Sequence, residues 1–298
     1  MDAAVTTCYR HPEVEARVSC TRCERHICPD CMREASVGHH CVECVAEGRK
    51  SVRQPLTVFG GRISAVPVVT YVLIALNVLF FLGELVRPAL LDELGMLGAA
   101  MKGPDGEYYV HQNPVPAGFE EEGVVAGEWY RLLTGAFLHL SPTESVFGIL
   151  HIALNMFSLW TIGRVVELQL GRARYLALYL LSALGSSVLV LLLAPDTDSV
   201  GASGAIFGLG AACYVINRRI GANREAVNRL MANLLIWMVI SAGFASWQGH
   251  LGGLLAGALV GVGFAFAPRS RRDVVHVAVC GGVLVLLMVL AVVKASSL

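Results

Sequence analysis

The sequence predicts an all-α membrane protein, a bundle of seven membrane-spanning helices preceded by a small cysteine-rich domain. Of the 298 residues, 55% are hydrophobic and only 15% are charged. Soluble globular proteins carry about 25% charged residues. Apolar runs of the length that crosses a bilayer as a helix recur from residue 67 onward. Seven of the nine cysteines lie between Cys8 and Cys44, ahead of the first apolar run.

Pairs of cysteine or histidine residues, each separated by two residues, recur through residues 8–44. They are Cys8/His11, Cys20/Cys23, Cys28/Cys31 and Cys41/Cys44. This spacing lets a tight turn aim both side chains at one ion, and Zn²⁺ takes four nitrogen or sulfur ligands. Residues 1–50 contain no apolar export signal, so we expect reduced cytosolic metal ligands rather than disulfides. Eight ligands predict two structural zinc ions; a less favoured alternative is that some of these thiols are spectators.

The order of these pairs resembles that of B-box-type zinc-binding domains, which interleave their ligand pairs. The resemblance implies one site formed by Cys8, His11, Cys28 and Cys31, and another formed by Cys20, Cys23, Cys41 and Cys44. His39 or His40 is an alternative ligand to Cys41. Without metal, so small a core cannot fold alone. We therefore expect residues 1–48 to be an interaction or regulatory module with a cytosolic protein partner, since a RING-like ligase fits the ligand order less well.

The apolar runs divide the remaining chain into seven predicted spans after a basic linker at 49–66. The spans lie at about 67–86, 145–165, 174–194, 202–217, 230–247, 250–267 and 274–294. The first six form a predicted core at 67–267. The seventh is an additional C-terminal helix within 268–298.

Basic residues alternate between the connections and thereby predict the orientation in the membrane. They gather before the first span and in the connections that follow the second, fourth and sixth spans, whereas the other connections are acidic or uncharged. The positive-inside rule then predicts a cytosolic N-terminus and an external C-terminus. The formal net charge is zero, which gives no argument for a nucleic-acid partner. The short basic loops favour a multi-pass protein of a bacterial plasma membrane.

Four polar residues occur at similar depth in three of the predicted spans. Ser203 opens the fourth span, His250 opens the sixth, and His151 and Asn155 lie one turn apart on the second. In the predicted orientation, all four lie in the outer part of the bilayer. Each alone is explained by helix packing, but together they suggest a nucleophile, a general base and two donors for a developing oxyanion. The Ser203 backbone N–H is a further potential donor.

Taken together, these residues resemble the rhomboid family of intramembrane serine proteases over about residues 67–267. The matching residues are Gly201, Ser203, Gly204, His250, Gly253, Gly257, His151, Asn155, Trp129 and Arg131. The resemblance implies a six-plus-one helix arrangement and a Ser203–His250 dyad without a third acidic residue or a catalytic cofactor. It further implies an oxyanion hole formed by His151, Asn155 and the Ser203 amide, with Gly253 and Gly257 letting the fourth and sixth spans approach closely. The implied substrates are single-pass proteins in the lipid bilayer, cut in or near their transmembrane segments.

Two features depart from the family pattern. The segment between His139 and His151 is longer than expected, and the long loop within 87–144 has no family counterpart that we can assign.

One alternative function is a catalytically inactive rhomboid-like protein that binds transmembrane helices, against which the intact Ser203 and His250 argue. A more distant alternative is a transporter, for which we would expect intramembrane acidic residues and paired broken helices, and the spans are expected to lack both.

Overall fold

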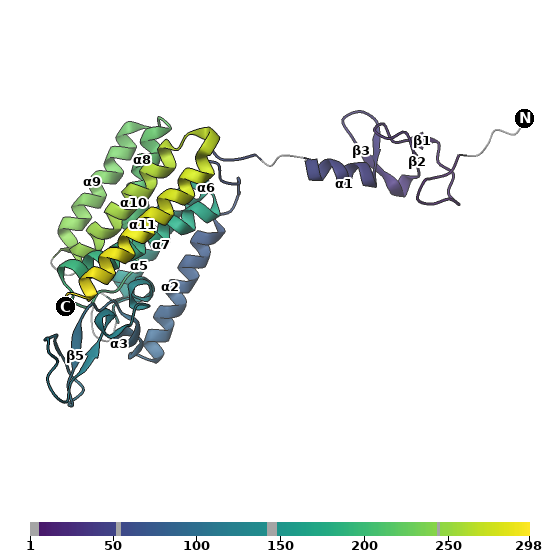
Figure 1. Cartoon of the computed structure of the whole chain (residues 1–298). Coiled ribbons are helices and arrows are strands. Elements are labelled where there is room, and N and C mark those ends of the chain that lie inside the picture. Colours follow the sequence, from purple (N-terminus) through teal and green to yellow (C-terminus); the bar gives the residue numbers. More distant parts are fainter. Residues whose placement is uncertain (1–5, 52–54, 142–147, 243–244) are drawn as a thin grey trace, which may run out of the picture. The chain divides into compact units, whose positions relative to one another are not determined.

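The computed structural model describes residues 6–51, 55–141, 148–242 and 245–298. The chain divides into two compact units, Met1–Pro55 and Leu56–Leu298 (Figure 1). Each unit has its own buried core.

The first unit is a pair of short antiparallel ladders followed by a helix. Strand β1 (Val18–Ser19) pairs with β2 (His26–Ile27), β3 (Met32–Glu34) pairs with β4 (His39–Cys41), and α1 (Val42–Ser51) follows directly. Its buried core consists of six cysteines together with Ala16 and Ile27. So little apolar surface cannot offset the loss of chain entropy, which agrees with a unit that depends on metal.

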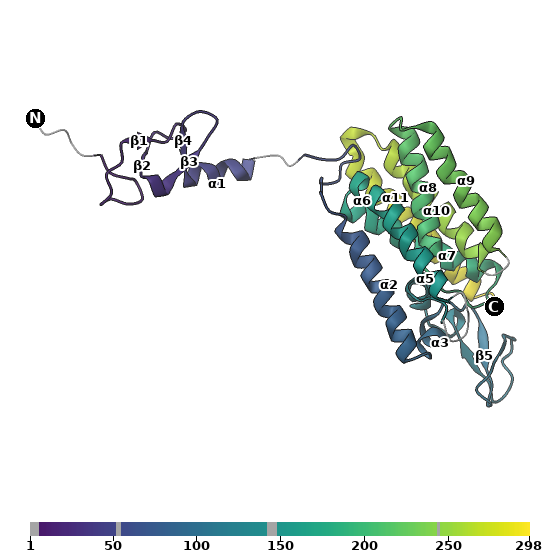
Figure 2. The same ribbon diagram turned by 180° about the vertical axis from the view of Figure 1, so that it is seen from behind.

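The second unit is a helical bundle, drawn from both sides in Figures 1 and 2. Its helices are α2 (Val68–Val86), α5 (Gly148–Ser158), α6 (Arg164–Leu170), α7 (Arg172–Leu193), α8 (Ser203–Arg219), α9 (Arg224–Ser241), α10 (Trp247–Phe266) and α11 (Arg272–Ala295). A π-helical turn at Leu159–Gly163 joins α5 to α6, so that these two form one continuous element.

Each of the seven predicted spans corresponds to a helix, although the boundaries shift. The second runs to Leu170, its predicted start at 145–147 lies outside the described residues, and the fifth begins at Arg224 rather than near 230. Within the described residues, five helical elements are long and apolar enough to cross a membrane: Val68–Val86, Gly148–Leu170, Arg172–Leu193, Trp247–Phe266 and Arg269–Ala295. The other two are α8, which has 17 residues, and α9, which has charged residues in its first turns.

Helix α8 lies inside the bundle, where it packs against α7, α9 and α10. Eleven of its 17 residues are buried, because small side chains line it on several sides. A helix enclosed by other helices presents little surface to lipid, which explains how a short and only moderately apolar segment occupies the centre. The Ser203 end of this helix forms the candidate site.

The long loop between α2 and α5 folds into a small capping structure. It contains α3 (Leu90–Leu94), a sheet of β5 (Ala100–Lys102), β6 (Tyr108–Val110) and β7 (Glu120–Glu122) in the order β6-β5-β7, and α4 (Arg131–Thr134). The sheet lies at the same end of the bundle as the C-terminus (Figure 1). At that end, Asn113 Nδ2 donates to the carbonyl of Leu298 at 3.2 Å.

Candidate active site and metal clusters

Helices α8 and α10 approach each other so closely that glycines are required along their contact. A Cβ on Gly253 would overlap the backbone of Gly204, and one on Gly257 would overlap the backbone of Gly208. One turn further, a Cβ on Gly261 would lie 2.8 Å from Ala212 Cα. The four-residue spacing on both helices forms a small-residue seam, which is the arrangement that brings membrane helices into backbone contact.

This seam brings together the side chains of Ser203 and His250. Each stands in the first turn of its helix, and His250 Nε2 lies 2.9 Å from Ser203 Oγ. His250 is 5% exposed, and the ring of Phe207 stacks on its imidazole with centroids 4.4 Å apart and planes 22° apart. The imidazole is therefore held in place by packing, within hydrogen-bond distance of the hydroxyl.

The tautomer of His250 follows from a second hydroxyl, that of Ser241 at the end of α9. Ser241 Oγ lies 3.1 Å from His250 Nδ1 and donates its own proton to the carbonyl of Met238 at 3.2 Å. With its single proton engaged in that way, Ser241 Oγ accepts from Nδ1–H. Nε2 is then unprotonated and accepts the Ser203 hydroxyl proton. A general base needs this tautomer.

His151 faces the same site from α5. A Cβ placed on Gly201 would lie 3.0 Å from His151 Nε2 and 3.7 Å from Ser203 Oγ. Gly201 has a φ of +127°, a conformation that favours glycine, and its amide donates to the carbonyl of Gly135 at 2.9 Å. The absent side chain at Gly201 thus leaves room beside both the serine oxygen and the histidine nitrogen.

Asn155 lies one turn along α5 from His151 and is 6% exposed. Its Nδ2 donates to the His151 carbonyl at 2.9 Å. An amide nitrogen has two hydrogens, so one remains for another acceptor.

Arg131 and Trp129 belong to the capping structure rather than to the dyad. Arg131 is only 2% exposed; its Nε donates to Glu128 at 2.6 Å and its Nη1 donates to the carbonyl of Gly95 at 3.1 Å. It therefore ties the segment before α4 to the end of α3. Trp129 is 37% exposed and therefore remains consistent with an interfacial anchor.

Two buried glutamates correct the expectation that the helices lack acidic residues. Glu84 on α2 is 0% exposed and Glu167 on α6 is 1% exposed. The Glu167 carboxylate accepts from the backbone amides of Val69 and Thr70 at 3.0 and 2.8 Å, and so joins the start of α2 to α6. Neither residue stands out in the sequence, because a single glutamate in an apolar run resembles a residue near a helix end.

The cysteine and histidine pairs of the first unit form two clusters with interleaved membership. One contains Cys8, His11, Cys28 and Cys31, and the other contains Cys20, Cys23, Cys41 and Cys44. Within each, the candidate ligand atoms all lie within 4.8 Å of one another. This partition is the one that the B-box resemblance implied. Among the described residues, neither His39 nor His40 belongs to a cluster.

The spacing of these atoms fits zinc. Tetrahedral bonds of about 2.3 Å to sulfur and 2.0–2.1 Å to nitrogen place two sulfurs about 3.8 Å apart, and a sulfur and a nitrogen about 3.6 Å apart. Cys23 Sγ and Cys41 Sγ are 3.8 Å apart, and His11 Nδ1 lies 3.2, 3.5 and 3.9 Å from the sulfurs of Cys28, Cys31 and Cys8. Thiolate and imidazole donors also favour Zn²⁺ over the hard cations.

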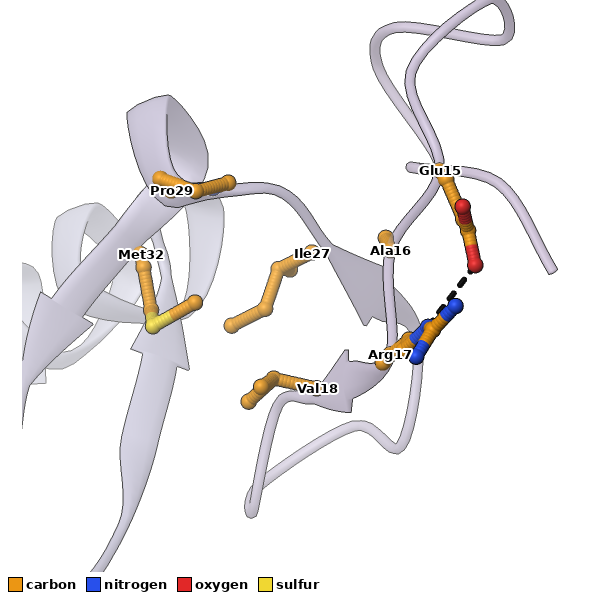
Figure 3. A pocket seen from close by; sticks show the side chains of 7 residues that line it. All are labelled: Glu15, Ala16, Arg17, Val18, Ile27, Pro29 and Met32. Carbon is orange, nitrogen blue, oxygen red and sulfur yellow. Dashed lines mark hydrogen bonds and ion pairs between the residues drawn. The ribbon is translucent and has the colours of Figure 1, made fainter.

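An open groove of about 260 Å³ lies on the surface of the first unit (Figure 3). Val18, Ile27 and Met32 point into it, while a 2.8 Å ion pair between Glu15 and Arg17 lies along one side. The groove is thus an apolar strip with a charged edge.

Comparisons with known proteins agree with the geometry of the bundle. The family model described as the rhomboid domain matches residues 126–267. The chain is 33% identical over 234 residues to rhomboid protease GluP of Bacillus subtilis (strain 168), covering 73% of this chain and 40% of that protein. It is 32% identical over 143 residues to a second protein of that organism, YdcA, whose name also refers to the rhomboid proteases. This match covers 46% of this chain and 68% of YdcA.

Plant proteins are also similar to this chain. RHOMBOID-like protein 5 of Arabidopsis thaliana is 36% identical over 159 residues, which cover 50% of this chain and 48% of that protein. The chain spans less than half the length of GluP and of this plant relative.

Proposed function

This chain belongs to the rhomboid family of multi-pass membrane proteins, and we propose that it is an intramembrane serine endopeptidase with a Ser203–His250 dyad. The observation that carries the proposal is the 2.9 Å contact between Ser203 Oγ and His250 Nε2, with Ser241 accepting from Nδ1–H. A half-buried serine hydroxyl beside an unprotonated imidazole nitrogen is the arrangement of an activated nucleophile.

In the proposed reaction, His250 takes the Ser203 proton as Oγ attacks the carbonyl carbon of the scissile bond. The carbonyl oxygen becomes an oxyanion, for which the Ser203 amide, His151 and Asn155 are the proposed donors. Collapse of the tetrahedral intermediate breaks the C–N bond, and His250 gives its proton to the leaving amine. Water, deprotonated by His250, then hydrolyses the acyl-enzyme and restores Ser203.

The proposed substrates are single-pass membrane proteins, cut in or near their transmembrane segments. The family acts on transmembrane substrates within the membrane, and the first turns of α8 and α10 carry the dyad here. We place this end of the bundle, with the capping sheet and the C-terminus, on the external side of a bacterial plasma membrane, and the first unit in the cytosol. The basic connections at 164–174, 218–229 and 269–272 support this orientation.

We propose that the first unit holds two structural zinc ions and binds a cytosolic protein or the cytosolic tail of a substrate. The apolar groove of Figure 3 is the candidate contact surface. Removing residues 1–48 should slow cleavage of substrates with long cytosolic tails more than cleavage of tail-less ones. Equal rates for both classes with and without residues 1–48 would rule out substrate recruitment.

A covalent serine-directed probe tests the enzymatic proposal against the inactive, helix-binding alternative. In membranes that contain the full chain, a fluorophosphonate should label the wild type, because His250 activates Ser203. Labelling should disappear in Ser203→Ala and His250→Ala, while Ser182→Ala, a buried serine of α7, should label normally. Absence of labelling in the correctly folded wild type would favour the inactive alternative.

A further inference from the structure

The carboxylate of Glu84 is buried beside the candidate site, yet the reaction proposed above does not use it. Glu84 lies near the end of α2 and is 0% exposed. Its oxygens lie 3.2 and 3.3 Å from the backbone nitrogen of His139, which donates to them. Within the described part of the chain, this amide is its only hydrogen-bond donor, and no arginine or lysine forms an ion pair with it. Burying a carboxylate costs free energy unless it is paired and hydrogen-bonded. A buried acidic residue in a membrane protein is therefore a candidate functional residue.

The next residue along the chain connects this contact to His151. The Leu140 backbone nitrogen lies 3.4 Å from His151 Nδ1 and donates to it. Since a backbone N–H can only donate, Nδ1 is the acceptor, and the neutral imidazole has its proton on Nε2. Nε2 is the nitrogen that faces the space beside Gly201 and Ser203 Oγ. The Leu140 amide thus directs the Nε2 proton towards the site.

The ring of His139 supports the same arrangement. Its centroid lies 5.2 Å from the His151 ring and 6.5 Å from the ring of Phe81 on α2, which it meets at 89°. His139 is fully buried, so its ring occupies the space between α2 and His151. Both the backbone and the side chain of this residue therefore connect α2 to His151.

We infer that Glu84 is a positioning residue for the oxyanion donor His151. By holding the His139 amide, the Glu84 carboxylate places the Leu140 N–H against Nδ1, which fixes the tautomer and the ring orientation of His151. The link passes from α2 through two successive backbone amides to the site. This inference rests on the proposed function of His151, although the tautomer itself exists whether or not the chain cuts a substrate.

The test combines kinetics in liposomes with ¹⁵N NMR of the His151 side chain in the full-length protein. The variants are Glu84→Leu, which removes the acceptor, and Glu84→Gln, which keeps a carbonyl oxygen. The control is Asn77→Leu: Asn77 is fully buried seven residues earlier on α2, and its Nδ2 donates within that helix to Leu73. A comparison with His151→Gln identifies the His151 signals.

We expect Glu84→Leu to lower kcat about tenfold with little change in KM, which corresponds to the loss of about one hydrogen bond to the transition state. The His151 spectrum should change from one Nε2–H tautomer to a mixture. Glu84→Gln should restore most of kcat and the single tautomer, and Asn77→Leu should retain both. An unchanged tautomer and kcat in folded Glu84→Leu would overturn the inference.

If Glu84→Leu fails to fold, an ester in place of the Leu140 amide provides the decisive variant, because it removes only the N–H that reaches Nδ1. The same tautomer change is expected, and its absence would refute the link. Failure of the proposed function looks different: the wild type would show the Nε2–H tautomer but cleave nothing. A wild-type protein with the Nδ1–H tautomer would overturn the positioning inference alone.

Discussion

At the scale of single residues, the hydroxyl of Ser241 should determine how well His250 can act as the proposed base. Replacing Ser241 with alanine removes the acceptor for Nδ1–H and lets the imidazole change tautomer or rotate. We predict that Ser241→Ala lowers kcat/KM about tenfold, the effect of one hydrogen bond of about 1.4 kcal/mol. Ser241→Thr keeps the hydroxyl and should lose much less, so equal losses in the two variants would argue against this role.

The sequence pointed to Ser203 and His250 because each begins an apolar run beside glycines. It did not point to Ser241 or Glu84, and the reason is physical. Ser241 is nine residues before His250, a separation with no helical or strand periodicity, and only the packing of α9 against α10 brings their side chains together. Glu84 contacts the backbone amide of His139, and a contact with a backbone amide leaves no pattern of side chains to find.

At the scale of secondary-structure elements, the seam between α8 and α10 limits which substitutions the bundle tolerates. A Cβ at Gly257 would overlap the Gly208 backbone, whereas a Cβ at Gly282 on α11 would meet nothing within 4 Å. We predict that Gly257→Ala destabilises the bundle by about 1–3 kcal/mol through overpacking, while Gly282→Ala is neutral or slightly stabilising. Thermal unfolding in detergent compares the two variants, and equal melting temperatures would contradict the close approach.

Helix α2 carries a row of polar residues on its buried face, although its sequence is mostly apolar. Thr70, Asn77 and Glu84 are spaced seven residues apart and are all fully buried. Spacing by seven places them on one face, towards the interior of the bundle. The sequence does not reveal this row, because the mean hydropathy of an apolar run stays high when only one residue in every two turns is polar.

The capping structure gives a prediction on pH. Burial alone would raise the pKa of Glu128, but hydrogen bonds from Arg131 and from the Gly123 amide outweigh it and lower the pKa. A lowered pKa in the folded state means that ionised Glu128 stabilises the cap above its unfolded pKa of about 4.3. That stabilisation is lost as the pH falls through the folded value.

The measurement is protease resistance of the 87–131 loop as a function of pH. The wild type should resist cleavage better than Glu128→Gln near neutral pH, and the difference should vanish in acid. If the difference in protease resistance persists at a pH where Glu128 is fully protonated, ionised Glu128 is not the group that stabilises the cap.

At the scale of the whole molecule, the chain joins a unit with two candidate metal clusters to a membrane-embedded bundle. The ligand pairs of the two clusters alternate along the chain, but the clusters have no ligand in common, so loss of one ligand should release one ion and leave the other. We predict two zinc ions per chain in the wild type and one in Cys44→Ser, while His39→Ala and His40→Ala retain two. Metal analysis of the purified protein checks this count, and loss of zinc in a histidine variant would overturn the ligand assignment.

Removing the metal should unfold the first unit without unfolding the bundle. Structural zinc contributes about 10–16 kcal/mol in small domains, more than a core of six cysteines, Ala16 and Ile27 can replace. A strong chelator should therefore make residues 6–51 sensitive to protease while the bundle stays intact. Unfolding of both units together would show that they depend on each other.

The central claim is that this chain cuts membrane proteins with Ser203 and His250. The most direct measurement is cleavage of a tagged single-span substrate in liposomes that contain the wild type, Ser203→Ala or His250→Ala. The account predicts cleavage by the wild type and a loss on the order of 10⁴-fold or more in each variant. Cleavage that survives in Ser203→Ala would contradict the account, because another nucleophile would then be doing the chemistry.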